Sequence, residues 1–450
     1  MRVIIIGAVA AGTSAATEIR RNHKDWEIIV YEKDTYISYV GCGMPFYISD
    51  EADSFVGLVP RGPEAFKEKD IDIFIQHEVL SIDPGTRTLT VQDLATDRRF
   101  EQSYDKLIIA TGATARKPEI KGVDQSNVFI LRNINHMIEI DAFIENQKPK
   151  KAAVIGGGFI GMEMVEAFRK LGMEVHLIAR SSISKGIDKE LTKVVEDHLK
   201  EQGVKVYTSA TIEEINGKGL VLADGTAMEA DIVLVATGIA PTVDLARQAG
   251  VELGGSGAIK VDKYMQTNLV DVYSCGDCIE VFHAVTGRPM YRPLGTTANK
   301  TGIIAGTNVS GIHMKFRGVL GTGIYRIFDM TVGQTGLSQE EAEKQGYDVV
   351  AVTTRRLNKT DFMGGRPIWI KLVADSEDGR LLGAQVIGYE GVDKRLDVLV
   401  TAITLNGRAE DLMYMDLGYS PPYSSARDPI YYAAVKLIAA LDNNLKNHEK

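Results

Sequence analysis

One cysteine in the sequence has surroundings that suit sulfur chemistry. Cys42 lies between two glycines in the segment Ser38–Phe46, after a predicted strand and before a helix predicted to begin near Pro45. The positive end of a helix dipole stabilises a thiolate, so we expect a lowered pKa for this thiol. The next cysteine along the chain is Cys275. Cys42 therefore has no local disulfide partner, and we expect it to react with a small thiol or an oxygen species.

Two glycine-rich turns could hold the phosphates of dinucleotides. Gly7–Gly12 follows the buried-strand pattern Arg2–Ile6, and Gly156–Gly161, which includes Gly158, follows a strand that begins at Ala152. Each turn precedes a helical pattern, so its backbone N–H groups and the helix dipole would face a pyrophosphate. A further strand comes after each helix, and the pair of turns therefore predicts two dinucleotide sites.

The residues that end the two following strands differ in charge. Glu32 lies 20 residues after Gly12, where a carboxylate accepts hydrogen bonds from ribose hydroxyls. After the second turn the corresponding strand ends with Ala179, Arg180 and two serines. A cation and hydroxyl groups in place of a carboxylate favour the 2′-phosphate of NADPH.

The order of elements around the first turn is repeated around the second. In each half a buried strand ends in Ala-Thr-Gly, at Lys106–Gly112 and again at Asp231–Gly238. Such a repeat predicts an α/β fold with two Rossmann-like dinucleotide-binding domains. After about Gly321 the pattern changes to β-type stretches followed by helices, which predicts a separate C-terminal α+β domain with a frayed polar tail at 443–450.

The composition excludes several classes of function. The chain has 450 residues, with 51 basic and 60 acidic side chains and a net charge of −9, which argues against a general nucleic-acid binder. We find no apolar run long enough to span a membrane and no N-terminal leader pattern. Three cysteines are too few for a disulfide framework, which suggests the cytoplasm, and the eight histidines lack the spacing of metal ligands.

These motifs together resemble the pyridine nucleotide–disulfide oxidoreductases, in the single-cysteine branch of coenzyme A disulfide reductases, NADH oxidases and NADH peroxidases. The resemblance extends from Gly7 to Asp428 and includes both Ala-Thr-Gly segments and Gly276-Asp277-Cys278. It implies that the first turn binds FAD with Asp277 at the ribityl chain, that the second binds NADPH or NADH, and that the C-terminal domain forms a homodimer.

The resemblance also supplies boundaries and further site residues. The expected boundaries are 1–115 for the first part of the FAD-binding domain, 116–240 for the NAD(P)H-binding domain, 241–320 for the second part of the FAD-binding domain, and 321–450 for the dimerisation domain. The cofactor-binding residues predicted in addition to those above are Ala10, Lys33, Val79, Thr111, Gly112, Ile160, Glu163 and Gly238.

Several residues resemble the substrate site of coenzyme A disulfide reductases. Tyr419 and Tyr423 would reach the cysteine of the partner subunit, and Arg427 would lie near coenzyme A phosphates. Matches at further substrate-contacting positions are Ser14, Arg21 and Ser38. Ala10 stands where oxidases and peroxidases of the branch have a histidine, so oxygen or peroxide chemistry at Cys42 would lack an acid–base group.

The sequence therefore predicts an FAD-dependent NAD(P)H oxidoreductase that reduces a small-thiol disulfide, coenzyme A disulfide in the first place, through Cys42. At rest Cys42 would carry coenzyme A as a mixed disulfide. An NADH oxidase and a persulfide or polysulfide reductase of the same branch stay open as alternatives. A non-enzymatic flavoprotein that senses redox state through Cys42 is an alternative of another class.

Overall fold

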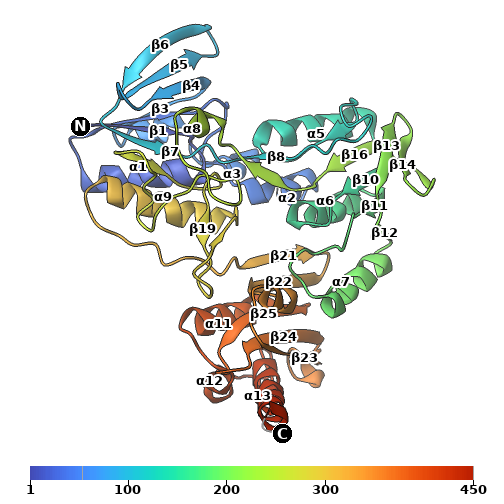
Figure 1. Ribbon diagram of the computed structural model, residues 1–450. Helices are drawn as coiled ribbons and strands as arrows, with labels where there is room; N and C mark the ends of the chain where they lie inside the picture. The colour runs from blue at the N-terminus through green and yellow to red at the C-terminus, as the bar shows by residue number, and fades with distance from the viewer. Residues whose placement is uncertain (53, 449–450) are drawn as a thin grey trace.

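The computed structural model describes residues 1–52 and 54–448. Figure 1 shows three groups of elements: the N-terminal sheet with the helices α1 and α9, a second sheet beside it, and a C-terminal sheet with the helices α11 to α13 below them. No helix within the described residues is long and apolar enough to cross a membrane.

The first sheet is parallel and has the strand order β18-β7-β1-β2-β3. Its strands are β1 (Arg2–Ile6), β2 (Glu27–Tyr31), β3 (Ile71–Phe74), β7 (Lys106–Ile109) and β18 (Val272–Ser274), and its two long helices are α1 (Ala10–Asn22) and α9 (Gly295–Val309). Strand β1 is apolar and buried from Val3 to Ile6, because it lies between β7 and β2 in the middle of the sheet. β18 comes from far along the chain, as a first domain in two parts requires, and the exact boundaries remain a prediction.

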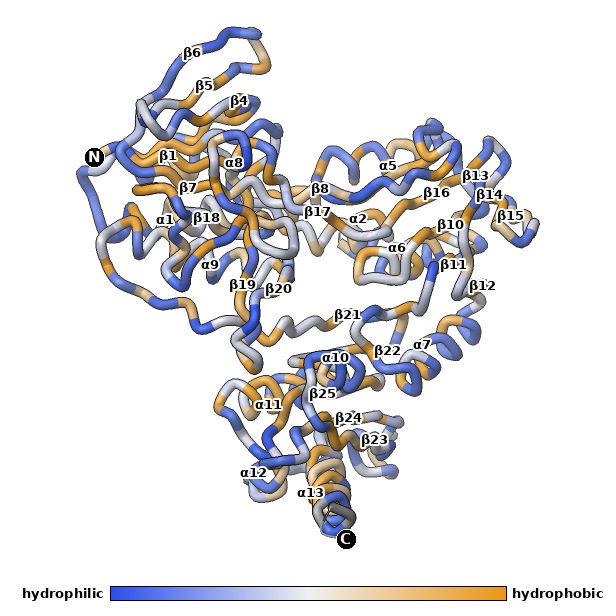
Figure 2. Tube along the Cα trace, viewed as in Figure 1, coloured by the Kyte–Doolittle hydropathy of each residue, from blue (hydrophilic) through white to orange (hydrophobic). Residues whose placement is uncertain are grey.

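The second sheet repeats this arrangement with the order β12-β11-β10-β16-β9. Its elements are β9 (Val128–Phe129), β10 (Lys151–Ile155), β11 (Glu174–Ile178), β12 (Lys205–Tyr207), β16 (Ile232–Val235), α5 (Ile134–Gln147), α6 (Phe159–Lys170) and α7 (Lys189–Glu201). In both halves the first helix begins inside the glycine-rich turn, at Ala10 and at Phe159, and not after it as expected. Figure 2 shows hydrophobic residues along β1, β7 and β16, whereas α7 is mainly hydrophilic.

Smaller antiparallel elements surround the two sheets. They are β4 (His77–Asp83), β5 (Thr88–Asp93) and β6 (Arg98–Ser103), then β13 (Ile212–Asn216), β14 (Gly219–Leu222) and β15 (Ala227–Glu229), the pair β8 (Ala113–Ala115) and β17 (Ile239–Pro241), and the pair β19 (Val281–Phe282) and β20 (Pro289–Met290). The short helices are η1 (Gly41–Gly43), α2 (Met44–Ile48), α3 (Phe55–Leu58), α4 (Pro63–Lys67) and α8 (Asp244–Gln248). β8 and β17 directly follow the two Ala-Thr-Gly segments, so these segments meet where the two halves join.

The C-terminal sheet is antiparallel with the order β21-β22-β25-β24-β23. Its elements are β21 (Gly323–Ile327), β22 (Met330–Gly336), α10 (Gln339–Lys344), β23 (Val349–Leu357), η2 (Asp361–Met363), β24 (Pro367–Asp375), β25 (Leu381–Gly388), α11 (Val392–Thr404), α12 (Ala409–Tyr414) and α13 (Pro429–His448). The expected frayed tail is wrong as far as 448, because α13 continues through it, and 449–450 lie outside the described residues.

Candidate active site

The first glycine-rich turn connects β1 to α1 and has no room for side chains at its ends. Gly7 has a φ of +105°, and a Cβ on Gly12 would lie 1.9 Å from the carbonyl oxygen of Gly7. Ala10 is the first residue of α1, so the N-terminal end of this helix lies within the turn. The turn therefore fits a pyrophosphate that approaches the backbone and the helix N-terminus.

Glu32 follows β2 and reaches back to this turn. The amide of Ala8 donates a hydrogen bond to its Oε2 at 2.8 Å, and the amide of Asp34 donates to Oε1 at 3.0 Å. Burial raises the pKa of Glu32, and these two hydrogen bonds lower it. The carboxylate is thus held beside the phosphate-binding turn, where we expect it to accept hydrogen bonds from ribose hydroxyls. The neighbouring Lys33 lies on the outside, 3.9 Å from a carboxylate oxygen of Glu78.

Asp277 has one carboxylate oxygen that is ready for a ligand. Its Oδ2 accepts a hydrogen bond from Nη2 of Arg132 at 2.9 Å, while its buried Oδ1 has no partner within the described part of the chain. A buried acceptor without a hydrogen bond costs free energy, so the site is incomplete without a donor such as a ribityl hydroxyl. The residues present therefore fit FAD. Arg132 lies in no recognisable motif, so the sequence offered no signal for it.

The two Ala-Thr-Gly segments form hydrogen bonds between the two halves of the structure, next to this site. Thr111 donates from its hydroxyl to the carbonyl oxygen of Thr242 at 2.7 Å, and Thr237 donates to that of Arg116 at 2.9 Å. Each threonine thus forms a hydrogen bond to the backbone that follows the other Ala-Thr-Gly segment. The glycines that follow, Gly112 and Gly238, have positive φ, and Val79 on β4 is buried in the first core.

The second turn has the same geometry as the first and opens to solvent. A Cβ on Gly161 would lie 1.9 Å from the carbonyl oxygen of Gly156, whereas around Gly158 nothing lies within 4 Å of that position. Gly158 is the N-cap of α6, and Ile160 lies in the first turn of this helix. The open space at the helix N-terminus fits the pyrophosphate of a second nucleotide.

Beyond β11 the predicted phosphate-binding residues are accessible. Ala179 is buried, and Arg180, Ser181 and Ser182 are exposed. Within the described residues Arg180 forms no ion pair. Its guanidinium is thus free to meet a ligand at the end of the strand.

The structure places Cys42 in η1, immediately before α2, and leaves it exposed between its two glycines. The expected lowering of its pKa is wrong. Desolvation raises the pKa of the thiol, the charges of Glu163 and Asp277 raise it further, and Arg132 alone lowers it. The five-residue α2 has too small a dipole to outweigh two carboxylates. Cys275 and Cys278 are both buried, as expected for packing residues.

Glu163 on α6 belongs to a charged group beside Cys42. Burial and the charge of Glu166 raise its pKa to about 7, and Arg326 lowers it. Glu166 itself accepts hydrogen bonds from the amide of Phe328 at 2.7 Å and from Arg326 at 3.0 Å. Because Arg326 lies on β21, this group ties the C-terminal sheet to the candidate site, and the sequence offered no signal for it.

The predicted tyrosines do not meet Cys42 of their own chain. Tyr419 and Tyr423 are 52% and 71% exposed and lie between α12 and α13 in the lowest part of Figure 1, whereas α2 lies near its centre. The segment is anchored by Asp428, whose carboxylate accepts from the Nε and Nη2 of buried Arg395 at 3.0 and 2.9 Å. Arg427 is exposed, with its guanidinium over the ring of Tyr431.

The three other predicted substrate contacts lie on α1 and just before η1. Ser14 donates from its hydroxyl to the carbonyl oxygen of Ala10 and to Oδ1 of Asn299 on α9. Arg21 pairs with Glu18 on the same helix. Ser38 is buried and accepts a hydrogen bond from Arg61 at 2.9 Å. Among the described residues there is no cluster of three or more side chains that could hold a metal ion.

Comparison with known proteins identifies two family models that match this chain. A model described as pyridine nucleotide-disulphide oxidoreductase matches residues 1–298, and one described as the dimerisation domain of the same family matches residues 324–429.

Two curated relatives match nearly the whole chain. A protein of Pyrococcus furiosus named NAD(P)H sulfur oxidoreductase (CoA-dependent) is 37% identical over 96% of this chain and 98% of its own length. A coenzyme A disulfide reductase of Staphylococcus haemolyticus is 32% identical over 95% of this chain and 97% of its own.

Two solved structures have the same fold. The reduced CoADR-RHD of Bacillus anthracis has a TM-score of 0.96 and 34% identity, covering 98% of this chain and 81% of that one. An engineered water-forming NADPH oxidase derived from a Lactobacillus brevis NADH oxidase, solved with NADPH, has a TM-score of 0.94 and 30% identity, covering 99% and 100%. Its changes include three consecutive positions, from aspartate, alanine and methionine to alanine, arginine and serine.

Proposed function

Because the chain belongs to the pyridine nucleotide-disulphide oxidoreductase family and is a NAD(P)H-dependent flavoprotein oxidoreductase, we propose that it reduces coenzyme A disulfide through Cys42. The observation that carries this proposal is the isolation of Cys42. It is exposed, and the two other cysteines are buried, so the sulfur that it exchanges with must come from a small molecule. Coenzyme A is the thiol in the names of relatives that match along the whole chain.

When bound, FAD would supply the two-electron relay between NAD(P)H and the sulfur of Cys42. Glu32 and Asp277 would hold it, and the turn Gly7–Gly12 would face its pyrophosphate. The Cys42 thiolate attacks one sulfur of the incoming disulfide, forms a mixed disulfide and releases the first thiolate, which takes up a proton. Two electrons, which NAD(P)H would supply through the bound flavin, and one proton then reduce the mixed disulfide, which releases the second thiol and restores the Cys42 thiolate.

The residues around Cys42 would control its proton. Arg132 favours the thiolate, whereas Glu163 and Asp277 disfavour it. With a pKa of about 7, Glu163 can hold or release a proton near neutral pH. The exposed Tyr419 and Tyr423 would come from the other subunit of a homodimer and protonate the departing thiolate, with Arg427 near the phosphates of coenzyme A.

NADPH would serve at least as well as NADH. Ala179, Arg180 and Ser181 have the same residue types, in the same order, as the three positions changed in the engineered NADPH oxidase. Arginine can form charge-assisted hydrogen bonds to a 2′-phosphate, and alanine removes the carboxylate that would repel it. The three free cysteines fit a reducing compartment, and we therefore place the enzyme in the cytoplasm.

The test combines mass spectrometry with a variant at Cys42. The untreated protein is expected to carry a coenzyme A adduct on Cys42 that a reductant removes. Cys42→Ser should abolish turnover of coenzyme A disulfide while NADPH still bleaches the flavin absorbance, with Cys278→Ser as the control because that thiol is buried. Normal disulfide turnover by Cys42→Ser would show that this thiol is not the redox centre.

Reduction of a coenzyme A persulfide is the second candidate, favoured by the relative named a CoA-dependent sulfur oxidoreductase. Measuring kcat/KM for coenzyme A disulfide and for a coenzyme A persulfide in one assay separates the two candidates, because both substrates would react at the same Cys42. An oxidase would consume oxygen at a comparable rate without added disulfide. Ala10 in place of a histidine argues against that outcome.

A further inference from the structure

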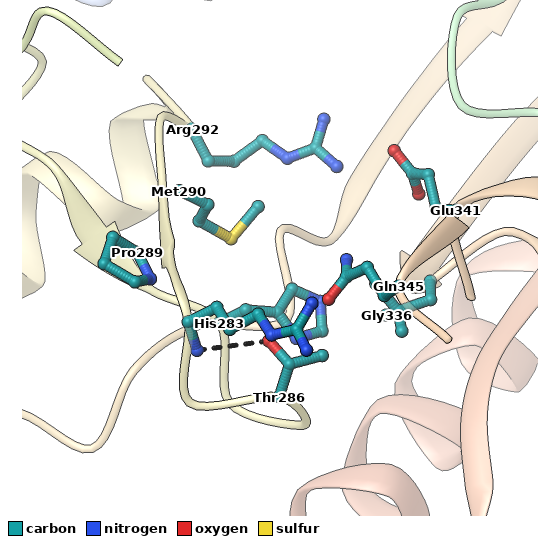
Figure 3. A pocket seen from close by; sticks show the side chains of 10 residues that line it. His283, Thr286, Pro289, Met290, Arg292, Gly336, Glu341 and Gln345 are labelled. Carbon is teal, nitrogen blue, oxygen red and sulfur yellow. Dashed lines mark hydrogen bonds between the residues drawn. The ribbon is translucent and has the colours of Figure 1, made fainter. Parts of the chain in front are cut away.

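A cavity that is separate from the candidate active site lies between the β19–β20 hairpin and the helix α10. Its volume is about 360 Å³, within the range of about 300–1,000 Å³ that is usual for small-molecule sites. Figure 3 shows His283 and Arg292 from the hairpin side, and Glu341 and Gln345 from the side of α10, pointing into the space between them. None of these residues belongs to the candidate active site.

The hairpin side of the cavity offers hydrogen-bond donors. His283 is 3% exposed, and its Nδ1 accepts a hydrogen bond from the amide of Val285 at 3.2 Å. The ring hydrogen is therefore on Nε2, because a neutral imidazole has one donor and one acceptor nitrogen. Nε of Arg292 is buried without a partner in the described part of the chain, whereas the ring of His283 interacts with the backbone of Gly336.

The opposite side of the cavity offers acceptors. Glu341 and Gln345 are four residues apart, on α10 and at its C-cap, so they lie on the same face of the helix. Oε1 of Gln345 is buried and has no partner among the described residues. Among the described residues, Glu341 accepts a hydrogen bond only through Oε2, from the amide of Ser338 at 3.1 Å, and its carboxylate lies beside the cavity.

Donors and acceptors on the two walls do not satisfy one another. An unpaired buried polar atom costs free energy, and two such atoms on opposite walls of one cavity, Nε of Arg292 and Oε1 of Gln345, indicate that a ligand completes them. That ligand needs an anionic acceptor for one wall and a cationic donor for the other. Met290 and Leu337 add apolar surface between the walls.

We propose that this cavity binds a free α-amino acid. Its carboxylate lies against Arg292 and His283, its ammonium group lies against Glu341 and Gln345, and an apolar side chain packs on Met290 and Leu337.

The test measures binding of the twenty free α-amino acids to the FAD-loaded protein in its native oligomeric state by isothermal titration calorimetry. At least one apolar amino acid is expected to bind. Its N-acetyl derivative, which lacks the ammonium group, and its carboxamide, which lacks the carboxylate, should each bind at least about tenfold more weakly, since each loses a charge-assisted hydrogen bond.

Two variants on α10 locate the binding. Glu341→Gln, which keeps a side chain able to cap the helix, and Gln345→Leu should each weaken binding about tenfold with unchanged flavin content. Glu343→Gln is the matched control, because Glu343 is on the same helix but outside the cavity. The proposal is overturned if no amino acid binds, if the derivatives bind as tightly as the parent, or if Glu343→Gln weakens binding as much as Glu341→Gln.

Discussion

At the scale of single residues, the electrostatics of Cys42 contradict the simplest expectation for a reactive thiol. A thiol before a helix should be acidic, yet desolvation and two carboxylates raise its pKa. If Cys42 reacts as a thiolate, as proposed, Arg132 is the neighbouring group that favours this form.

Glu163→Gln should make Cys42 more reactive towards iodoacetamide. The ionised carboxylate raises the pKa of the thiol, so its removal should lower that pKa and increase the thiolate fraction severalfold at pH 8. The difference should disappear below about pH 6, where Glu163, with its pKa of about 7, is protonated. The alkylation rate of the reduced holoenzyme measures this, with the exposed Glu68→Gln as control. Equal rates at pH 8 would mean that Glu163 does not act on the thiol.

Arg180→Ala should lower kcat/KM for NADPH and leave that for NADH nearly unchanged. A charge-assisted hydrogen bond contributes about 1.5–3 kcal/mol, or about ten- to a hundredfold in affinity. Ala179→Glu should shift preference towards NADH, because it adds a ribose acceptor and repels the phosphate. Initial rates with both nucleotides decide the point. A wild-type preference for NADH that Arg180→Ala does not alter would make Arg180 an ordinary surface residue.

At the scale of elements, glycines on α9 let its backbone touch α1, the helix that carries the first turn and Ser14. A Cβ on Gly302 would lie 2.3 Å from the carbonyl oxygen of Ala11, and one on Gly306 would lie 2.6 Å from that of Ala15. The position of α1 over the candidate FAD site therefore depends on small residues of a helix almost three hundred positions later in the chain.

Gly302→Ala should destabilise the holoenzyme, although alanine is the better helix former. The added methyl group must displace backbone, and overpacking of this kind costs about 1–3 kcal/mol. Flavin release on heating should accordingly begin at a lower temperature. Lys300→Ala introduces the same residue at an exposed position of α9 and should change little. If both variants release flavin at the same temperature, the two helices tolerate a wider separation.

At the scale of the whole molecule, the two tyrosines proposed to act at Cys42 lie apart from it within one chain. Tyr419 and Tyr423 are exposed and belong to a part of the fold that is separate from α2 (Figure 1). Buried Arg395 holds Asp428 in place, so the segment is fixed in the C-terminal domain. A symmetric dimer would bring this segment to the Cys42 of the partner, since each subunit gives and receives the same contact.

Mixed dimers test this arrangement. Tyr419→Phe/Tyr423→Phe should lower kcat by about 10²- to 10⁴-fold, the usual contribution of a general acid. When this inactive double variant is mixed with inactive Cys42→Ser and the subunits are exchanged, half of the dimers should contain one intact site. About one quarter of wild-type activity should return. Absence of any regain would show that these tyrosines do not act across the dimer.

The sequence by itself determined the features that depend on short stretches of chain. Both glycine-rich turns, the position of Glu32 beside the first turn, and the accessible Cys42 could be predicted, because a strand, a turn and a helix specify one another within about twenty residues. The family resemblance, carried by these same motifs, is confirmed by models that match residues 1–298 and 324–429.

Only the tertiary structure decided the electrostatics and the contacts that join distant segments. Arg132 meets Asp277 across 145 residues of sequence, and Glu163 lies near enough to Cys42 to raise its pKa. The cavity between the β19–β20 hairpin and α10 likewise exists only because two domains meet. Desolvation and Coulomb interactions depend on distance in space, which no periodicity in the sequence records.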